Sequence, residues 1–192
     1  MKPLILASQS PRRKQLLEQV QIPFSIVSSQ IEEKMNHELS PEELVLSLAA
    51  QKAEAVYRDH QDHVVLAADT IVVIDGRVLG KPNSAEEAVH MLKRLSGQTH
   101  HVLTGVSIFG QNRNVCFFEK AEVTFFPLTD EEILAYVRSG EPSDKAGAYG
   151  IQGLGATLVE KISGDYFTIV GLPIARVVRV LKNEFQITRS MK

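Results

Sequence analysis

Cysteine is nearly absent from this chain, since Cys116 is the only one among 192 residues. A single cysteine excludes an internal disulfide and a cysteine-ligated metal cluster. The segment after it, Phe117-Phe118-Glu119-Lys120, carries no arginine, so it cannot be the phosphate-binding loop of a tyrosine phosphatase. Its apolar neighbours instead predict a packed residue in a strand.

The chain also lacks long hydrophobic runs and an excess of charge of one sign. No apolar stretch reaches the length that crosses a bilayer, and no signal-peptide pattern follows Met1, so we expect a cytoplasmic protein without a membrane partner. There are 21 Lys and Arg against 23 Asp and Glu, a net charge of −2, and the basic residues are scattered. A nucleic-acid partner that needs a broad basic face is therefore not expected.

Alternating strand and helix patterns fill the chain, of which 44% is hydrophobic. Apolar runs and alternations predict strands at 4–7, 24–27, 64–68, 71–74, 78–79, 102–109, 115–126, 157–162 and 166–170. Cap or breaker residues predict helices that begin after Ser10, Ser40, Ser84, Thr129 and Pro173. No linker divides these elements. We expect residues 1–192 to form one α/β domain, a twisted mixed sheet flanked by helices, with a frayed tail at about 185–192.

The most informative segment joins the first predicted strand to the first predicted helix. It reads Ser8-Gln9-Ser10-Pro11-Arg12-Arg13-Lys14, with Ser10 suited to the N-cap and Pro11 to the first helical position. Such a turn offers N–H groups, hydroxyls and guanidinium groups at the positive end of a helix dipole, where a phosphate is stabilised. Arginine in a first turn opposes the dipole by about 0.3–1 kcal/mol, and a charge-assisted bond to an oxyanion contributes about 1.5–3 kcal/mol. The alternative is a solvated basic turn paired with Glu18 or Glu32.

Asp69 is the strongest candidate for a reacting group. It follows the apolar run 64–68, and a carboxylate at the end of a buried strand is costly to desolvate unless cations or hydrogen-bond donors surround it. Strand ends in α/β sheets border ligand crevices, where Asp69 can bind a hard cation or accept a proton from water. The alternative is that Asp69 caps a turn through Thr70.

Other polar residues give weaker indications. Glu32 and Glu33 follow a predicted strand and can supply a second oxygen ligand to a metal, although adjacent acids on a loop are more often solvated. Lys81 stands between a glycine and a proline, which restricts its backbone and can aim its ammonium at a phosphate. In the glycine-rich passage 144–155, Gln152 carries an amide that can read a base edge, and a set of turns is the alternative.

Taken together, these segments resemble the Maf family of nucleoside triphosphate pyrophosphatases over nearly the whole chain. The likeness is carried, in chain order, by Leu6-Ala7-Ser8-Gln9-Ser10-Pro11-Arg12-Arg13, Ala68-Asp69-Thr70-Ile71-Val72, Leu79-Gly80-Lys81-Pro82, Asp144-Lys145-Ala146-Gly147-Ala148-Tyr149-Gly150-Ile151-Gln152-Gly153 and Gly164-Asp165-Tyr166. The resemblance implies hydrolysis between the α and β phosphates of a nucleoside triphosphate, with a divalent metal cation, Mg²⁺ or Mn²⁺. It also implies two lobes with a cleft between them, a homodimer and a cytoplasmic house-cleaning role.

The resemblance assigns roles to particular residues as well. Asp69 matches the family's proton acceptor, and the positions that line the phosphate and metal site are matched by Ser8, Arg13, Glu33, Lys52 and Lys81, with Glu33 and Asp69 as metal ligands. Arg12, Thr70 and Gln152 match the specificity positions of the branch that acts on dTTP and UTP. The alternatives are a pyrophosphatase of the same family for 7-methyl-GTP or purine-type nucleotides, and a non-catalytic nucleotide-sensing regulator of cell division, because family members have been linked to septum formation.

Overall fold

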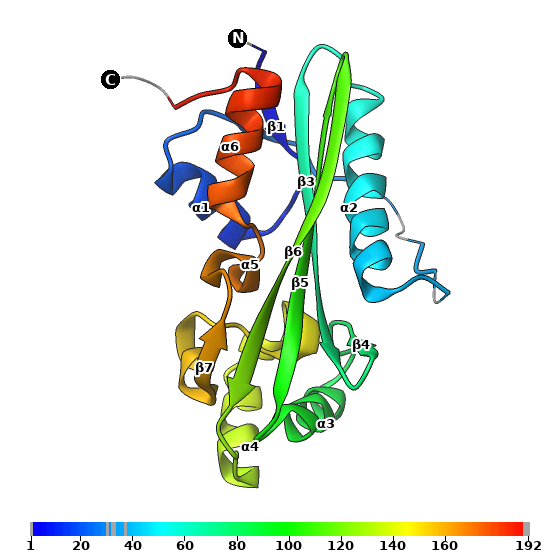
Figure 1. Ribbon diagram of the computed structural model, residues 1–192. Coiled ribbons are helices and arrows are strands. Elements are labelled where there is room, and N and C mark those ends of the chain that lie inside the picture. Colours follow the sequence, from blue (N-terminus) through cyan, green and yellow to red (C-terminus); the bar gives the residue numbers. More distant parts are fainter. Residues whose placement is uncertain (1, 30, 32–33, 37, 190–192) are drawn as a thin grey trace. The chain divides into compact units, whose positions relative to one another are not determined.

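The computed structural model describes residues 2–29, 31, 34–36 and 38–189. Its contacts divide the chain into two compact units, the first built from residues 1–69, 104–119 and 171–192 and the second from residues 70–103 and 120–170. Three long strands, β3 (Val64–Ile74), β5 (Thr99–Gly110) and β6 (Arg113–Phe125), contribute residues to both units. Figure 1 shows the elements in chain order.

Within the described residues, seven strands form one sheet in the order β2-β1-β3-β5-β6-β7, with β4 paired to β3. The shorter strands are β1 (Leu4–Leu6), β2 (Ser25–Ile26), β4 (Arg77–Leu79) and β7 (Val159–Ser163). β1 is parallel to β2 and to β3, whereas the β3–β4 and β6–β7 pairs are antiparallel. The mixed sheet with its helices confirms the predicted α/β class.

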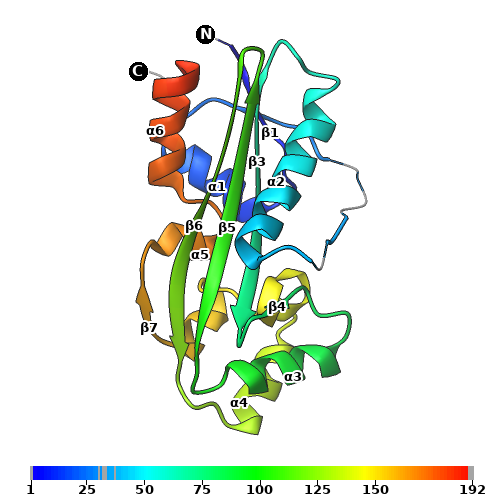
Figure 2. The ribbon, with the colours of Figure 1, turned by 45° about the vertical axis from the view of Figure 1, so that its right-hand side comes forward.

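The first unit has a core on the side of the sheet that α2 (Pro41–Tyr57) covers. A cluster joins alternate strand residues to this helix and consists of Ile5, Ala7, Ala53, Val56, Val65 and Ala67. α2 approaches β5 so closely that a Cβ on Gly105 would lie 2.4 Å from the Val45 carbonyl oxygen. Figures 1 and 2 show α1 (Pro11–Gln19) and α6 (Ile174–Phe185) on the side of β1 and β3 opposite to α2. The sheet of this unit is therefore covered on both faces.

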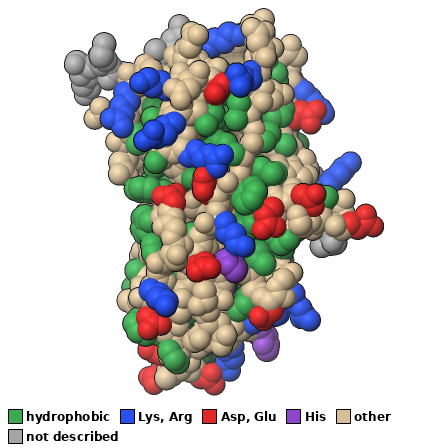
Figure 3. Space-filling model, in the orientation of Figure 1, with side chains coloured by type: hydrophobic (Ala, Val, Ile, Leu, Met, Phe, Trp, Pro, Cys, Tyr) green, Lys and Arg blue, Asp and Glu red, His purple; other side chains and the backbone are tan. Residues whose placement is uncertain are grey.

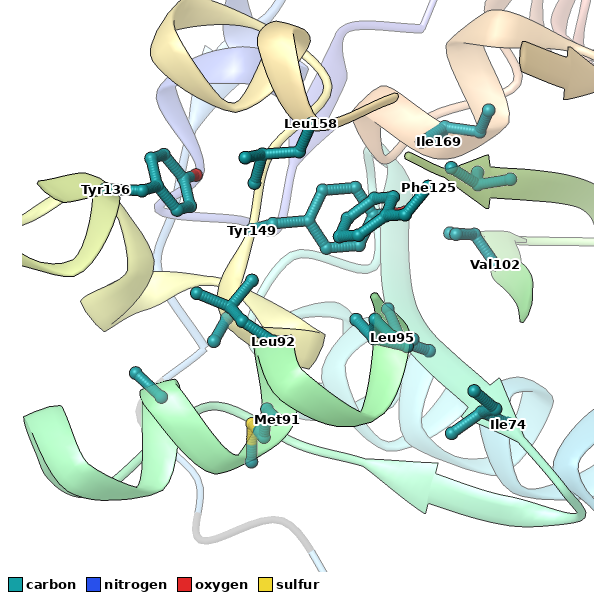
Figure 4. Packing of buried hydrophobic residues seen from close by; sticks show 14 of the residues in the cluster. Ile74, Met91, Leu92, Leu95, Val102, Phe125, Tyr136, Tyr149, Leu158 and Ile169 are labelled. Atoms are coloured by element: carbon teal, nitrogen blue, oxygen red, sulfur yellow. The ribbon is translucent and has the colours of Figure 1, made fainter. Parts of the chain in front are cut away.

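The second unit has its own core, part of which Figure 4 shows. α3 (Ala85–Leu95), α4 (Asp130–Arg138) and α5 (Tyr166–Val170) accompany three short 3-10 helices, η1 (Glu141–Asp144), η2 (Ala146–Ala148) and η3 (Gly153–Leu158). The rings of Phe125 and Tyr149 meet edge to face with centroids 4.7 Å apart, and Leu92 and Leu95 of α3 belong to the same cluster. Aliphatic helix residues and aromatic rings thus fill one continuous core.

Most predicted helix starts are confirmed by their caps. The side chains of Ser40, Ser84 and Thr129 each accept a hydrogen bond from a backbone N–H in the first turn of their helices. α6 ends at Phe185, but the chain remains packed beyond it, because Ile187 is buried and its N–H donates to the Leu181 carbonyl at 3.0 Å. No helix in the described ranges is long and apolar enough to cross a membrane.

Two strand predictions are wrong. β3 is not interrupted at Asp69 but runs without a break to Ile74, because its second half pairs with β4 and Asp69 finds a cationic partner. The segment Tyr166–Val170 is α5 rather than a strand. Its β-branched and aromatic residues favour a strand, but Asp165 Oδ2 accepts hydrogen bonds from the Thr168 N–H at 2.9 Å and from Thr168 Oγ1 at 2.8 Å, which starts a helix.

Two further predictions, on the burial of Cys116 and on the start of the last strand, need a smaller correction. Cys116 lies in β6 as expected, but it is exposed, with its Sγ 2.8 Å from Ser107 Oγ. Successive residues of a strand point to opposite faces, so the buried Phe117 turns Cys116 outward. The last strand of the sheet begins at Val159 rather than at 157, because η3 extends to Leu158.

Candidate active site

The turn after β1 holds a serine and an arginine in contact. Ser8 is buried, and its Oγ accepts hydrogen bonds from Arg13 Nη1 and from the Ser10 N–H, both 3.2 Å long. Arg13 Nε donates to the Gly171 carbonyl at 2.8 Å. Two oxygens from separate segments of the first unit therefore fix the orientation of the Arg13 guanidinium.

The start of α1 differs from the other helix starts. Ser10 occupies its N-cap position without making a capping hydrogen bond, and no acidic residue lies in the first turn, where the helix dipole favours negative charge. The alternative pairing of this basic turn is confirmed for Lys14, whose Nζ forms an ion pair of 3.7 Å with Glu18 Oε1, and Glu32 lies outside the described residues. An uncapped helix start that carries two arginines is suited to an anion.

α2 and β3 bring an acid and a base into contact. Lys52 Nζ donates a hydrogen bond to Asp69 Oδ1, and each side chain keeps 14% of its surface exposed. The lysine offsets the cost of desolvating the carboxylate. Because a carboxylate can accept about four hydrogen bonds, Asp69 also has the capacity to receive one from water. The interpretation of Asp69 as a turn cap is wrong, since β3 continues through Thr70.

The register of the sheet relates these two features. β1 and β3 are parallel with Leu6 opposite Leu66, and the Ala7 N–H donates to the Leu66 carbonyl at 2.8 Å. Continued by two residues, this register sets Ser8 level with the residue that precedes Asp69. The Ser8–Arg13 turn therefore follows β1, the strand that is paired with β3, which carries Asp69.

The other predicted site residues lie in several further segments of the chain. Arg12 is half-buried in the first turn of α1. Thr70, Lys81 and Gln152 belong to the second unit, where Lys81 and Gln152 are exposed. Glu33 lies outside the described residues. Their roles stay predictions.

Sequence reasoning missed the residues that hold the segment around Gln152. The Glu141 carboxylate accepts hydrogen bonds from the backbone N–H groups of Leu154 at 2.9 Å and Gly155 at 3.3 Å. A lone glutamate after the glycine that ends α4 gives no periodic or spacing signal. Only the fold reveals such contacts between a side chain and a distant backbone segment.

The described residues also bear on metal binding. Within these ranges no group of three or more His, Cys, Asp or Glu side chains is arranged to hold a metal ion. Asp69 nevertheless offers the carboxylate oxygens that Mg²⁺ and Mn²⁺ prefer. Mg²⁺ usually binds through one or two carboxylates together with water and substrate phosphates, without a cage made wholly of protein. The chemistry of Asp69 therefore fits an ion that binds together with a polyphosphate.

A mixed sheet flanked by helices, with a lysine-paired acid in β3 and an arginine-bearing helix start after β1, defines an α/β protein whose charged groups suit an anionic ligand. Comparison with known families is more specific, because the family model described as "Maf-like protein" matches residues 3–184. The chain belongs to this family, as its sequence motifs predict.

Individual relatives match along nearly their whole length. The dTTP/UTP pyrophosphatase of Bacillus velezensis is 58% identical over 97% of this chain and 98% of its own. Proteins of the same name from Bacillus cereus and Halalkalibacterium halodurans are each 57% identical over 95% of this chain, and 95% and 96% of their own. Among solved structures, the Staphylococcus aureus Ham1 protein is 15% identical, with a TM-score of 0.48 over 98% of this chain and 92% of that chain.

Proposed function

We propose that this protein is a nucleoside triphosphate pyrophosphatase that hydrolyses dTTP and UTP to the nucleoside monophosphate and pyrophosphate. The observation that supports the proposal is the Lys52–Asp69 pair on β3, together with the Ser8–Arg13 turn that follows the paired strand β1. In this proposal Asp69 is the proton acceptor and the Ser8–Arg13 turn is the anion site. The names of three relatives at 57–58% identity support the choice of substrate.

In this proposal the first unit grips the triphosphate. Arg13, oriented by Ser8 and Gly171, presents its guanidinium to the phosphate oxygens, together with the N–H groups at the start of α1. Each charge-assisted hydrogen bond to an oxyanion contributes about 1.5–3 kcal/mol. Arg12 of the same helix start adds further positive charge to this task, and Lys81 keeps its predicted role as a phosphate ligand.

Asp69 is the proposed general base. Its carboxylate accepts a proton from the attacking water, while Lys52 holds Oδ1 and so fixes the plane of the carboxylate. Positioning and charge neutralisation supply most of the catalysis, because the transferred phosphoryl group needs no covalent partner from the protein. The half-buried setting strengthens these electrostatic interactions relative to bulk water.

A divalent cation is part of the proposal. Asp69 and Glu33 would hold Mg²⁺ or Mn²⁺, as the donor chemistry of carboxylates allows. Such an ion neutralises charge on the phosphate oxygens and polarises the bond that breaks. Lys52 then prevents Asp69 from turning away, because it engages one of the two carboxylate oxygens.

Base selection falls to Arg12, Thr70 and Gln152. The Gln152 side chain is exposed and has no hydrogen-bond partner among the described residues, so its amide can donate to and accept from the polar edge of a pyrimidine. We also infer a cytoplasmic homodimer that removes non-standard pyrimidine nucleotides and has no nucleic-acid or membrane partner. Light scattering coupled to gel filtration tests the dimer, for which we expect twice the mass of one chain.

The experiment that tests the function is a panel of nucleotides incubated with the purified protein and Mg²⁺ or Mn²⁺, with detection of both products. We expect the highest kcat/KM for dTTP and UTP, with equal amounts of monophosphate and pyrophosphate. A preference for 7-methyl-GTP or purine nucleotides would assign the other substrate class of the family. Nucleotide binding without any turnover would assign a regulator instead.

A further inference from the structure

The segment that carries Gln152 is held by three side chains of the second unit. Glu141, Tyr136 and His100 each form a hydrogen bond with the segment 149–155. Gln152 itself is exposed and forms no side-chain hydrogen bond within the described part of the chain. The position of its amide is therefore set by the backbone on either side of it.

Glu141 holds the C-terminal side of this segment. Its Oε1 accepts the Leu154 N–H at 2.9 Å and its Oε2 accepts the Gly155 N–H at 3.3 Å, so both carboxylate oxygens are used. The approach is close enough that a Cβ on Gly153 would lie 2.6 Å from Oε1, and Gly153 has a φ of +66°. These backbone hydrogen bonds, that of Leu154 foremost, lower the pKa of Glu141, which keeps it a carboxylate at neutral pH.

Tyr136 joins the two sides of the segment. Its hydroxyl accepts the Gly150 N–H at 3.2 Å and forms a side-chain hydrogen bond with Glu141. A Cβ on Gly155 would lie 2.1 Å from the Gly150 carbonyl oxygen and 2.7 Å from Tyr136 Oη. Gly150 and Gly155 therefore lie close together beside the buried Tyr136 side chain, and Gln152 lies between them in the chain.

The N-terminal side is anchored in the core. Tyr149 Oη lies 2.7 Å from His100 Nε2, and both side chains are buried. Ring contacts of Tyr149 with His100 and Phe125 pack this anchor edge to face, as Figure 4 shows for Tyr149 and Phe125. Movement of Gly150 is therefore restricted from the core side, while Glu141 alone supplies both acceptors on the other side.

We propose that Glu141 is a positioning residue for base recognition, which acts through the backbone of Leu154 and Gly155 to hold the Gln152 amide where it meets the pyrimidine. This inference rests on the proposed function and extends it to a residue that touches no substrate. Glu141→Gln keeps the size of the side chain but replaces one acceptor oxygen with an NH₂ group, which cannot accept from a backbone N–H. The segment 149–155 then loses one of its two hydrogen bonds to residue 141, while the contact between Tyr149 and His100 remains.

The test measures kcat/KM for UTP and CTP, two substrates that differ only at the base edge. For Glu141→Gln we expect the ratio of kcat/KM for UTP to that for CTP to fall about tenfold, chiefly through a higher KM for UTP. Glu160→Gln is the matched control, because Glu160 is an exposed residue of β7, and its ratio should equal that of the wild type. Thermal unfolding of each variant separates a shifted segment from a loss of fold.

Tyr136→Phe is the second variant, and it keeps the ring in the core while it removes the hydroxyl that accepts from Gly150 and contacts Glu141. We expect the same direction of change in the UTP to CTP ratio, so the inference stays testable if Glu141→Gln does not fold. In a Gln152→Ala background, Glu141→Gln should change the ratio no further, because the two residues act through one amide.

The outcomes distinguish this inference from the function on which it rests. A wild-type protein that releases no pyrophosphate from UTP overturns both. A wild-type protein that turns over UTP in preference to CTP, with the same preference in folded Glu141→Gln and Tyr136→Phe, overturns the positioning role alone. A further drop in the ratio when Glu141→Gln is added to Gln152→Ala overturns it as well, because Glu141 would then act by another route.

Discussion

Lys52 Nζ donates a hydrogen bond to Asp69 Oδ1, which ties α2 to the long strand β3 within the first unit. Neither side chain is fully buried, and each retains 14% exposure. Ser8, which holds Arg13, follows β1, the strand that is parallel to β3 and paired with it. In the proposed function, Asp69 is the proton acceptor that the hydrolysis of a phosphate anhydride requires, and Lys52 holds it in place.

Replacing the proposed base should abolish most of the activity. Asp69→Asn is expected to lower kcat by about 10²–10⁴-fold, because an amide cannot take a proton from water. The product of UTP hydrolysis, measured as pyrophosphate, gives the rate, and circular dichroism checks the fold. The exposed Asp59 supplies the control, since Asp59→Asn should leave kcat unchanged. Unchanged turnover in Asp69→Asn would remove Asp69 from the mechanism.

Removing the partner of Asp69 should affect stability as well as activity. Lys52→Met leaves a half-buried carboxylate without its cation, and we expect the free energy of unfolding to fall by about 1–3 kcal/mol. Lys93→Met breaks an ion pair with Asp130 whose side chains are 47% and 75% exposed, so the change there should be close to zero. Urea unfolding of the two variants provides the comparison. Equal losses would show that the shielding of the Lys52–Asp69 pair has no energetic consequence.

Changing the amide of Gln152 to a carboxylate should alter base choice more than phosphate binding. Gln152→Glu removes the NH₂ donor, so we expect a larger loss of kcat/KM for dTTP and UTP than for other nucleotides. Inhibition by pyrophosphate measures the phosphate site separately and should stay nearly the same. A uniform loss for every nucleotide would show that Gln152 does not read the base.

His100 should make stability depend on pH. Burial, with a smaller effect of His101, lowers the pKa of His100 from 6.5 to about 4, so the folded protein keeps it neutral. The unfolded chain takes up a proton below pH 6.5 while the folded chain does not, and stability falls as the pH drops from 6.5 towards 4. The full loss from this group is about 3 kcal/mol.

Urea unfolding between pH 7 and 4.5 measures this effect. The wild type should lose about 2–3 kcal/mol more over this interval than His100→Gln, which has no imidazole to protonate there. His90→Gln, at an exposed position, is the control and should follow the wild type. Parallel curves for wild type and His100→Gln would mean that His100 is protonated equally in both states.

Sequence patterns were sufficient for the elements whose signals are local. The starts of three helices were predicted from their N-cap residues, and the structure contains the capping hydrogen bonds of Ser40, Ser84 and Thr129. The prediction of a strand at 166–170 was wrong, because these residues favour a strand. The residue that caps the helix, Asp165, does not by itself distinguish a helix start from a turn. Asp69 was recognised as a candidate from its position after an apolar run. The continuation of its strand was not predicted, because the lysine that compensates its charge lies 17 residues earlier in the chain.

The site shows the same division between local and distant information. The run from Ser8 to Arg13 is contiguous, so its chemistry was readable, whereas the Gly171 carbonyl that orients Arg13 lies 158 residues away. The role of Glu141 was not predicted, because its backbone partners lie 13 and 14 residues further along the chain. The 3-10 helices of this region bring them near. Contacts of this kind depend on the fold and leave no pattern in the sequence.

The most direct test of the account follows UTP by phosphorus NMR in the presence of Mg²⁺ and the purified protein. We expect UMP and pyrophosphate to appear in equal amounts and at the same rate, with no UDP at any time, and we expect the rate of both to fall by about 10²–10⁴-fold with Asp69→Asn. Formation of UDP and orthophosphate, or equal rates in the wild type and the variant, would contradict hydrolysis between the α and β phosphates by Asp69.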